Sequence, residues 1–275
     1  MIRGNAVIAT AGFFLGSYAG INLQILTALL LGISCVIGSG CVLNNYFDRH
    51  IDAKMDRTKN RAFVEGAVSE KKALIFAVIL MIVGFGILFF TNTLAILTVF
   101  VGAIVYVGIY TPLKHISSHA ALVGSISGAV PAVAGYLAAK NTFDLGAVIL
   151  FFILVLWQMP HFYSIAIYRL NDYSAAGIPV LSVKKGISHT KLQMFFYILI
   201  FTLVTVSLSI FGYAGVSYAL VALMLGSIWS ILALWGFNPN TLDVKWARGM
   251  FIYSLVVIMV LCVTISVESV LMHHL

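Results

Sequence analysis

The sequence contains very little charge. Of its 275 residues, only 9% are Asp, Glu, Lys or Arg, whereas 61% are hydrophobic, and the mean hydropathy is +1.06. A soluble domain carries about 25% charged residues, so this chain cannot present a water-soluble surface over most of its area. No polar stretch is long enough to form a separate soluble domain. We therefore predict one integral membrane domain over residues 1–275.

Cysteine is also scarce. Cys35, Cys41 and Cys262 all lie within apolar runs and lack the spacing of metal ligands, so we expect them to pack inside the protein. We expect no signal peptide either, because no basic segment followed by a small-residue cleavage site stands apart from the second apolar run.

Long apolar runs make up most of the remaining sequence. A helix needs about 20 residues to cross a hydrocarbon core of about 30 Å, and nine runs approach that length. Their unbroken apolar character indicates helices, since the strands of a membrane barrel alternate polar and apolar residues. The predicted fold class is all-α, a polytopic bundle of nine transmembrane helices. The runs cover about residues 5–21, 23–43, 72–90, 93–111, 119–139, 145–168, 191–211, 215–235 and 247–267.

The basic residues are placed asymmetrically. Fifteen of the sixteen Lys and Arg residues fall on one side of the predicted bundle, and Lys140 alone falls on the other. By the positive-inside rule the basic side is cytoplasmic, or faces the matrix if the membrane is mitochondrial. Nine spans then put the N-terminus inside and the C-terminus outside. This placement indicates a lipid bilayer, and not nucleic acid, as the partner. The two longest loops, about 44–71 and 169–190, lie on the basic side, where we expect function.

The first long loop begins with a row of polar side chains. Asn44, Asp48, Asp52 and Asp56 recur every four residues, a spacing that keeps them on one helical face. Like charges at this spacing repel each other, and Mg²⁺, which prefers hard oxygen ligands, would relieve the repulsion. With a rise of about 1.5 Å per residue, Asp48 and Asp52 can share an ion with Asn44 or Asn45. Asp56 is too far along and is expected to support the site or form an ion pair.

Basic residues accompany the row and leave two interpretations open. Arg57 and Arg61 either donate hydrogen bonds to a diphosphate or serve only as the positive-inside signal. The row itself is either a metal site or a solvated helix end whose acids are balanced by Arg49, Lys54 and Arg57.

A second group of polar residues lies near the end of the run 145–168. Pro160 is expected to kink or break the helix and to free carbonyl groups. His161 is an ionisable side chain at membrane depth, which makes it a functional candidate. The alternative is a histidine that forms a hydrogen bond with a neighbouring helix.

Further polar residues follow this run on the basic side. Arg169 and Asp172 precede a turn over residues 174–179, and Lys184 adds another positive charge. Two such clusters facing each other would suit a Mg²⁺-bound diphosphate. Aromatic residues crowd both clusters, and they either belong to the interfacial belt or face a developing carbocation. They are Tyr46, Phe47, Tyr106, Tyr110, Trp157, Phe162, Tyr163, Tyr168 and Tyr173.

Together the motifs resemble the UbiA superfamily of intramembrane prenyltransferases, and within it the branch that farnesylates haem. The superfamily pattern is Asn-Asp-x-x-Asp-x-x-x-Asp after one helix and Asp-x-x-x-Asp after another. Here Asn45 and Ala176 replace one acid of each motif, and both departures are typical of that branch. The resemblance covers nearly the whole chain and is carried by residues 44–52 with 57–61, 110–114, 157–161 and 172–181.

The start of the chain departs from the family. Members usually begin with a longer cytoplasmic segment that carries a Lys-Pro pair, whereas Met1 here stands close to Gly4 and Asn5. We expect contacts from that segment to be missing.

The resemblance implies a central cavity open to the cytoplasmic side of a bacterial inner membrane. It also implies farnesyl transfer from farnesyl diphosphate to a vinyl group of protohaem IX (haem B), with water addition, to give haem O. Mg²⁺ would be the cofactor, and haem A synthase or terminal oxidase assembly would be partners. His161 would contact haem, as an iron ligand or near the macrocycle.

The residues implied in this site fall into three groups. The catalytic residues are Asp48, Asp52, Asp172 and His161. The metal ligands are Asn44, Asn45, Asp48, Asp52 and Asp172. The diphosphate ligands are Arg57, Arg61, Lys114, Arg169 and Lys184.

Two other functions remain possible. A prenyltransferase that acts on a quinone precursor, chlorophyllide or another aromatic acceptor would have acids at positions 45 and 176, where this chain has Asn45 and Ala176. A transporter would place broken polar segments near the membrane midplane in paired halves. Here the charges gather at one surface and no repeat is visible.

Overall fold

A computed structural model describes residues 2–17 and 20–274, with side chains described as far as Leu271. These residues form helices and connecting loops, and no strand occurs among them. The long helices are α2 (Leu23–Asp52), α3 (Glu70–Leu88), α6 (Ala120–Lys140), α7 (Leu145–Tyr168), α10 (Ile187–Ile210), α11 (Val216–Trp235) and α12 (Asp243–His274).

The remaining elements are shorter. One continuous helical segment consists of α4 (Thr93–Ile104), the π-helix η1 (Val105–Tyr110) and α5 (Thr111–Leu113). The three other short helices are separate segments: α1 (Ile2–Gly16), α8 (Leu170–Ala176) and α9 (Leu181–Lys185).

The predicted all-helical membrane fold is confirmed. Eight helical segments within the described residues are long and apolar enough to cross a membrane, and they correspond to the predicted runs from 23–43 onward. The ninth predicted run, 5–21, contains α1, which has only 15 residues and ends at Gly16. Tyr18 and Ala19 of that run lie outside the described residues. The count of nine spans therefore stays a prediction.

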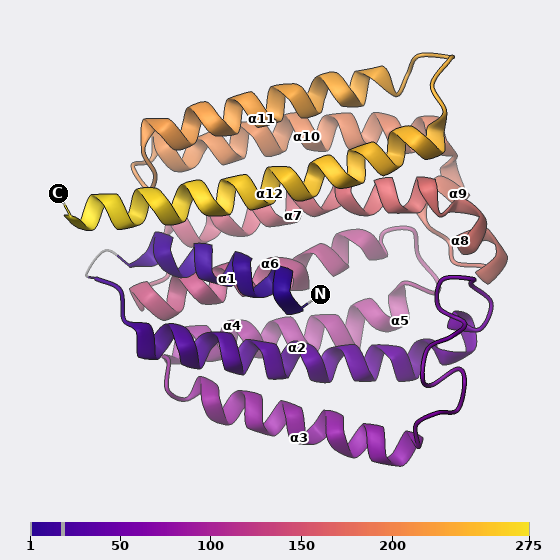
Figure 1. Ribbon diagram of the computed structural model, residues 1–275, viewed down its shortest axis with the longest axis horizontal. Coiled ribbons are helices and arrows are strands. Elements are labelled where there is room, and N and C mark those ends of the chain that lie inside the picture. The colour runs from indigo at the N-terminus through magenta and orange to yellow at the C-terminus, as the bar shows by residue number, and fades with distance from the viewer. Residues whose placement is uncertain (1, 18–19, 275) are drawn as a thin grey trace.

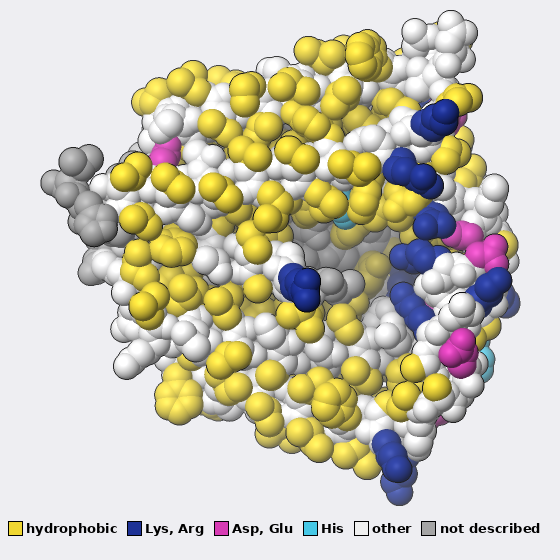
Figure 2. Space-filling model, viewed as in Figure 1, with side chains coloured by type: hydrophobic (Ala, Val, Ile, Leu, Met, Phe, Trp, Pro, Cys, Tyr) yellow, Lys and Arg dark blue, Asp and Glu magenta, His cyan; other side chains and the backbone are white. Residues whose placement is uncertain are grey.

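The helices lie side by side along one direction (Figure 1). α6 and α7 are the most buried spans and contact each other at the centre. On one side of this pair, α4 packs on α6 and α2 on α3, and on the other α7 contacts α10 and α12. Large hydrophobic side chains cover most of the outer surface (Figure 2), as expected for contact with lipid.

Both long connections lie at one end of the bundle. The loop after α2 and the helices α8 and α9 share this end (Figure 1), and most of the Lys and Arg side chains visible in Figure 2 gather there. The one-sided distribution of charge that the sequence predicts is thus present in three dimensions.

At the opposite end, side chains cap the starts of the helices. Asn22 accepts hydrogen bonds from the amides of Gln24 and Ile25 at 3.0 and 3.1 Å, which satisfies two otherwise unpaired donors of α2. Glu268 of α12 does the same for α11, where it accepts from the amides of Gly215 and Tyr218 at 2.8 Å each. The cap by Glu268 also joins the C-terminal part of α12 to the start of α11.

α1 is held against α6 by an unusually close approach of the two backbones. A Cβ atom on Gly12 would overlap the carbonyl oxygen of Ala132, and a Cβ atom on Gly135 would overlap that of Ala9. Small residues allow helices to pack this tightly in a membrane, where dispersion contacts and not water drive association. This contact positions α1 beside the cavity described below.

Replacing Gly135 with valine is expected to loosen α1 from α6, because the new side chain would strike the backbone of Ala9. Overpacking costs typically about 1–3 kcal/mol, so the thermal unfolding midpoint in detergent should fall. Gly86→Val is the control, since Gly86 is exposed on α3 and a Cβ atom there meets nothing within 4 Å. Equal midpoints for the two variants would contradict this packing.

Candidate functional site

The end of α2 carries two buried carboxylates. The side chain of Asp48 accepts a hydrogen bond at Oδ2 from Asn44 Nδ2 at 3.0 Å and another from Lys114 Nζ at 2.5 Å. Lys114 Nζ also donates to Asn44 Oδ1 at 2.5 Å. The predicted pairing of Asn44 with Asp48 on one helical face is therefore present, and a cation from another span holds both oxygens.

The second carboxylate is neutralised by its own loop. Asp52 is 2% exposed, and its Oδ2 lies 2.6 Å from Arg61 Nη1. Thr58 Oγ1 donates to the carbonyl oxygen of Asp52 at 3.0 Å, which folds the loop back over the end of the helix. Arg61, predicted as a diphosphate ligand, thus lies next to a predicted metal ligand.

Asp56 does not belong to this row. α2 ends at Asp52, so the four-residue repeat no longer keeps Asp56 on the same face. Its exposed carboxylate forms an ion pair with Lys59 at 2.8 Å, as expected for an ion-pair partner.

His115 is a member of this site that the sequence interpretation missed. Its Nε2 lies 3.3 Å from Asp48 Oδ1, and only its position directly after Lys114 could have drawn attention to it. Burial lowers the pKa of His115, and it also lowers the pKa of Lys114, although the neighbouring Asp48 partly offsets both effects.

The oxygen atoms at the end of α2 suit a hard cation. Asn44 Oδ1 and Asp48 Oδ2 already surround one positive charge, and the buried Asp48 Oδ1 accepts no hydrogen bond within the described residues. No group of three or more His, Cys, Asp and Glu side chains gathers around one point in the described part of the chain. A Mg²⁺ ion held here would therefore need amide and phosphate oxygens as well, which this ion accepts.

The second polar group lies on α8. Asp172 is bound by Arg169, whose Nη1 lies 3.5 Å from Asp172 Oδ2. Within the described residues, no hydrogen bond or ion pair joins Asp172 to Asp48 or Asp52. The role of Asp172 as a ligand of the same ion stays a prediction.

The two polar segments nevertheless meet. Met55, Ala176 and Ile178 form a small buried apolar cluster that joins the loop after α2 to the segment after α8. Burial raises the pKa of Tyr173, whereas the charge of Arg57 lowers it, which places that exposed guanidinium near α8. Lys184, by contrast, is exposed on α9 and forms no ion pair within the described residues.

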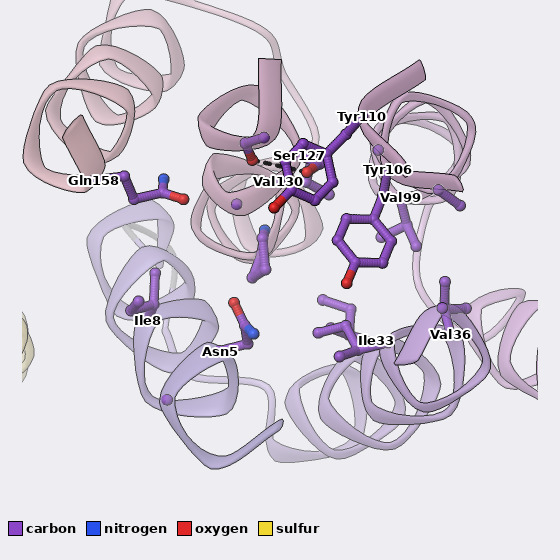
Figure 3. Close-up of a pocket in the computed structure, with 18 of the residues that line it drawn as sticks. Asn5, Ile8, Ile33, Val36, Val99, Tyr106, Tyr110, Ser127, Val130 and Gln158 are labelled. Atoms are coloured by element: carbon purple, nitrogen blue, oxygen red, sulfur yellow. Dashed lines mark hydrogen bonds between the residues drawn. The ribbon is translucent and has the colours of Figure 1, made fainter. Parts of the chain in front are cut away.

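A cavity of about 500 Å³ lies directly below the first cluster. Gly40 and Tyr110 line it, and each stands one helical turn before a residue of the cluster, Asn44 and Lys114 respectively. The rings of Tyr106 and Tyr110 stack with centroids 5.6 Å apart, and both side chains point into the cavity (Figure 3). Most of the remaining wall is apolar.

The π-helix η1 places these two tyrosines. Its wider turn, with hydrogen bonds from residue i to residue i+5, ends where the amide of Thr111 donates to the carbonyl of Tyr106. Gly124 on α6 leaves room for the ring of Tyr110, since a Cβ atom there would lie 2.8 Å from its Cε2. Of the nine aromatic residues that the sequence singled out, Tyr106, Tyr110, Trp157 and Phe162 line the cavity.

Of the two effects expected of Pro160, a kink or a break, the break is wrong. α7 runs as one helix from Leu145 to Tyr168 and passes through Pro160, because its neighbours α6, α10 and α12 enclose it on several sides. His161 lines the cavity and also forms a hydrogen bond to α12, with its Nδ1 2.8 Å from Ser254 Oγ. The hydrogen bond to a neighbouring helix is thus present, and the functional role of His161 stays a prediction.

The polar cluster contains cations and lies above an apolar cavity with aromatic walls, and both lie within a membrane bundle. This arrangement is typical of an intramembrane protein that binds an amphipathic anion. Residues 5–255 match the UbiA prenyltransferase family, and the chain belongs to that family. It is 47% identical over 270 residues to protoheme IX farnesyltransferase of Sodalis glossinidius, a match that covers 98% of this chain and 91% of that protein. Protoheme IX farnesyltransferase 2 of Pseudomonas fluorescens strain Pf-5 is 46% identical over 270 residues, again 98% of this chain and 91% of that protein.

Solved structures confirm the fold. Digeranylgeranylglyceryl phosphate synthase is similar with a TM-score of 0.81 at 16% identity, over 98% of this chain and 96% of that one. A UbiA homologue from Archaeoglobus fulgidus, bound to GPP and Mg²⁺, is similar with a TM-score of 0.68 at 15% identity, over 97% and 98% of the two chains.

Removing either buried carboxylate is expected to abolish prenyl transfer. Asp48→Asn and Asp52→Asn should lower the turnover rate by about 10²-fold or more, the usual effect of losing a group that stabilises charge in a transition state, while the protein still inserts into membranes. Asp56→Asn serves as the control because Asp56 is exposed and lies off the row. Near-normal turnover in either of the first two variants would refute their assignment.

Proposed function

We propose that this chain transfers the farnesyl group of farnesyl diphosphate to a vinyl group of protohaem IX, with addition of water, to make haem O. The observation that carries this proposal is the position of the Asn44–Asp48–Lys114 cluster directly above a largely apolar cavity lined by Tyr106 and Tyr110. It occurs in a chain that is 46–47% identical, over 98% of its length, to protoheme IX farnesyltransferases.

The polar cluster binds the diphosphate. Asn44 and Asp48 would hold Mg²⁺, which would neutralise the diphosphate and help it to leave. Lys114 and Arg61 lie beside these carboxylates and would donate hydrogen bonds to the phosphate oxygens. Groups fixed in place before the reaction stabilise the developing charge without reorganising. That a UbiA homologue from Archaeoglobus fulgidus was solved bound to GPP and Mg²⁺ supports the use of Mg²⁺ with a prenyl diphosphate.

The cavity receives the farnesyl chain. Its volume of about 500 Å³ falls in the usual range for one small ligand, about 300–1,000 Å³. Tyr106 and Tyr110 present aromatic faces just below the diphosphate, where the allylic carbon becomes positive. An aromatic face stabilises such a cation, and the apolar walls keep bulk water from reaching it.

Haem approaches from the side of α12. The surface is hollowed between α2 and α12 beside the start of α1 (Figure 2), and Asn5, Phe251 and Leu255 line the cavity there. A cavity filled by a farnesyl chain leaves no space for a whole macrocycle, so only the edge with the vinyl group enters. His161 contacts the macrocycle from α7.

The bonds change in a simple order. The bond between farnesyl C1 and the diphosphate oxygen breaks, and the terminal vinyl carbon forms a bond to C1. The positive charge then lies on the porphyrin-side carbon of the former vinyl group. Water adds to that carbon and loses a proton, which leaves a neutral alcohol.

The protein functions in a bacterial cytoplasmic membrane with its basic end on the cytoplasmic side. This orientation follows from the positive-inside rule, and it places the C-terminus in the periplasm. Haem A synthase or a terminal oxidase under assembly would receive the product.

Membranes that contain the chain should convert haem B and farnesyl diphosphate, in the presence of Mg²⁺, to a product heavier by one farnesyl and one hydroxyl group. Mass spectrometry of the extracted haems measures this, and chelation of divalent cations should abolish it. Prenylation of an aromatic acceptor other than haem, with no modified haem, would favour the alternative prenyltransferase function.

His161→Ala is expected to lower the affinity for haem B or to alter its Soret band, because the imidazole contacts the macrocycle in this proposal. Absorption titration of the purified protein with haem measures both quantities. An unchanged affinity and an unchanged Soret band would remove His161 from the haem site.

A further inference from the structure

Two polar side chains of α7 stand in the otherwise apolar wall of the cavity. Gln158 and His161 lie one helical turn apart and both line it. The proposed reaction needs one water molecule at the porphyrin-side carbon, yet the cavity must exclude water from the allylic cation. A water molecule confined by fixed polar groups would meet both requirements.

The amide of Gln158 is fixed in one orientation. Its Nε2 donates to the carbonyl oxygens of Leu154 at 2.9 Å and Ser125 at 3.1 Å, which uses both N–H groups. Oε1 therefore remains as an acceptor, and Figure 3 shows it at the end of the side chain that reaches from α7 toward the cavity. Gly128 makes this position possible, because a Cβ atom there would overlap Oε1.

The tautomer of His161 follows from its partner. Ser254 Oγ donates its only proton to the carbonyl oxygen of Phe251 at 2.6 Å, so it must accept in its contact with His161 Nδ1 at 2.8 Å. Nδ1 thus carries the proton of the neutral ring. Nε2 carries the lone pair and is an acceptor.

The imidazole ring of His161 is also held on its faces. Trp157 stacks on it with centroids 5.0 Å apart, and Phe251 lies 4.9 Å away at a tilt. Trp157 Nε1 donates to the carbonyl oxygen of Ser254 at 2.7 Å. One serine of α12 therefore sets both the tautomer of His161 and the position of the indole that supports it.

We propose that Gln158 Oε1 and His161 Nε2 bind the water molecule that becomes the hydroxyl group of the product, and that His161 Nε2 accepts its proton. This inference rests on the proposed function. The water oxygen forms the new C–O bond with its lone pair, its O–H bond breaks, and the positive charge passes from carbon to the imidazole. Without this water, the carbocation loses a proton from the adjacent new CH₂ group and becomes an alkene.

The ratio of alcohol to alkene in the product tests this assignment. In Gln158→Leu and His161→Phe the ratio should fall by at least about tenfold, since general-base catalysis contributes about 10²–10⁴-fold. Phenylalanine keeps the contacts with Trp157 and Phe251. Ser254→Ala should lower the ratio less, because it keeps the imidazole and only allows the ring to adopt either tautomer. Mass spectrometry separates the two products, and isotopically labelled water identifies the source of the oxygen.

Ser127→Ala is the matched control. Ser127 lines the same cavity, but its hydroxyl donates to the carbonyl of Gly124 at 2.8 Å within α6, so the ratio should not change.

A normal ratio with lower total transfer in all three test variants would overturn the inference and leave a structural role. A Soret band typical of an axial imidazole, lost in His161→Phe, would also overturn it by assigning Nε2 to the iron. If the unaltered protein forms neither product, the proposed function fails instead.

Discussion

Burying two carboxylates at the membrane end of α2 is the constraint on which the rest of the site depends. A charge removed from water is expensive unless an opposite charge accompanies it. Asp48 obtains that charge from Lys114, which lies 66 residues further along the chain, and Asp52 obtains it from Arg61. These two ion pairs fix the span 93–113 and the folded loop relative to α2. They also hold Asn44 Oδ1 and Asp48 Oδ2 around one positive charge, that of Lys114.

The cavity depends on a different principle: residues without a side chain leave space for others. Gly124 and Gly128 of α6 leave space for Tyr110 and for the amide of Gln158. Without those glycines, neither polar group could reach the cavity wall from its own helix. Paired charges thus form the polar cluster, whereas glycines make room for the cavity. The two lie one helical turn apart along α2 and along the span 93–113.

Much of this could be predicted from the sequence. Composition and run length gave the membrane bundle, and the four-residue spacing identified Asn44, Asp48 and Asp52 as neighbours. The end of α2 could not be predicted, because charged residues beyond the apolar run carry no clear stop signal. The helix in fact extends nine residues past the predicted run and stops at Asp52.

Other features depend on tertiary contacts that a single sequence does not display. His115 reaches Asp48 only because two spans pack together. Pro160 does not break α7, since packing on several sides outweighs one lost backbone hydrogen bond. The choice of four cavity-lining aromatics among nine follows from helix rotation, which periodicity cannot fix for helices that are apolar all round. The role of Asp172 stays a prediction, because it depends on an ion and a substrate that a sequence does not display.

The π-helix η1 links the length of one span to the chemistry at its end. A residue of an α-helix advances the rotation by about 100°, and the wider π turn accommodates Val105–Tyr110 before α5 begins. If the same six residues coiled as a regular α-helix instead, each would advance the rotation further, and Lys114 would turn away from Asp48. The position of a single ammonium group at the membrane surface thus depends on how tightly the chain coils inside the membrane, and not only on how many residues cross it.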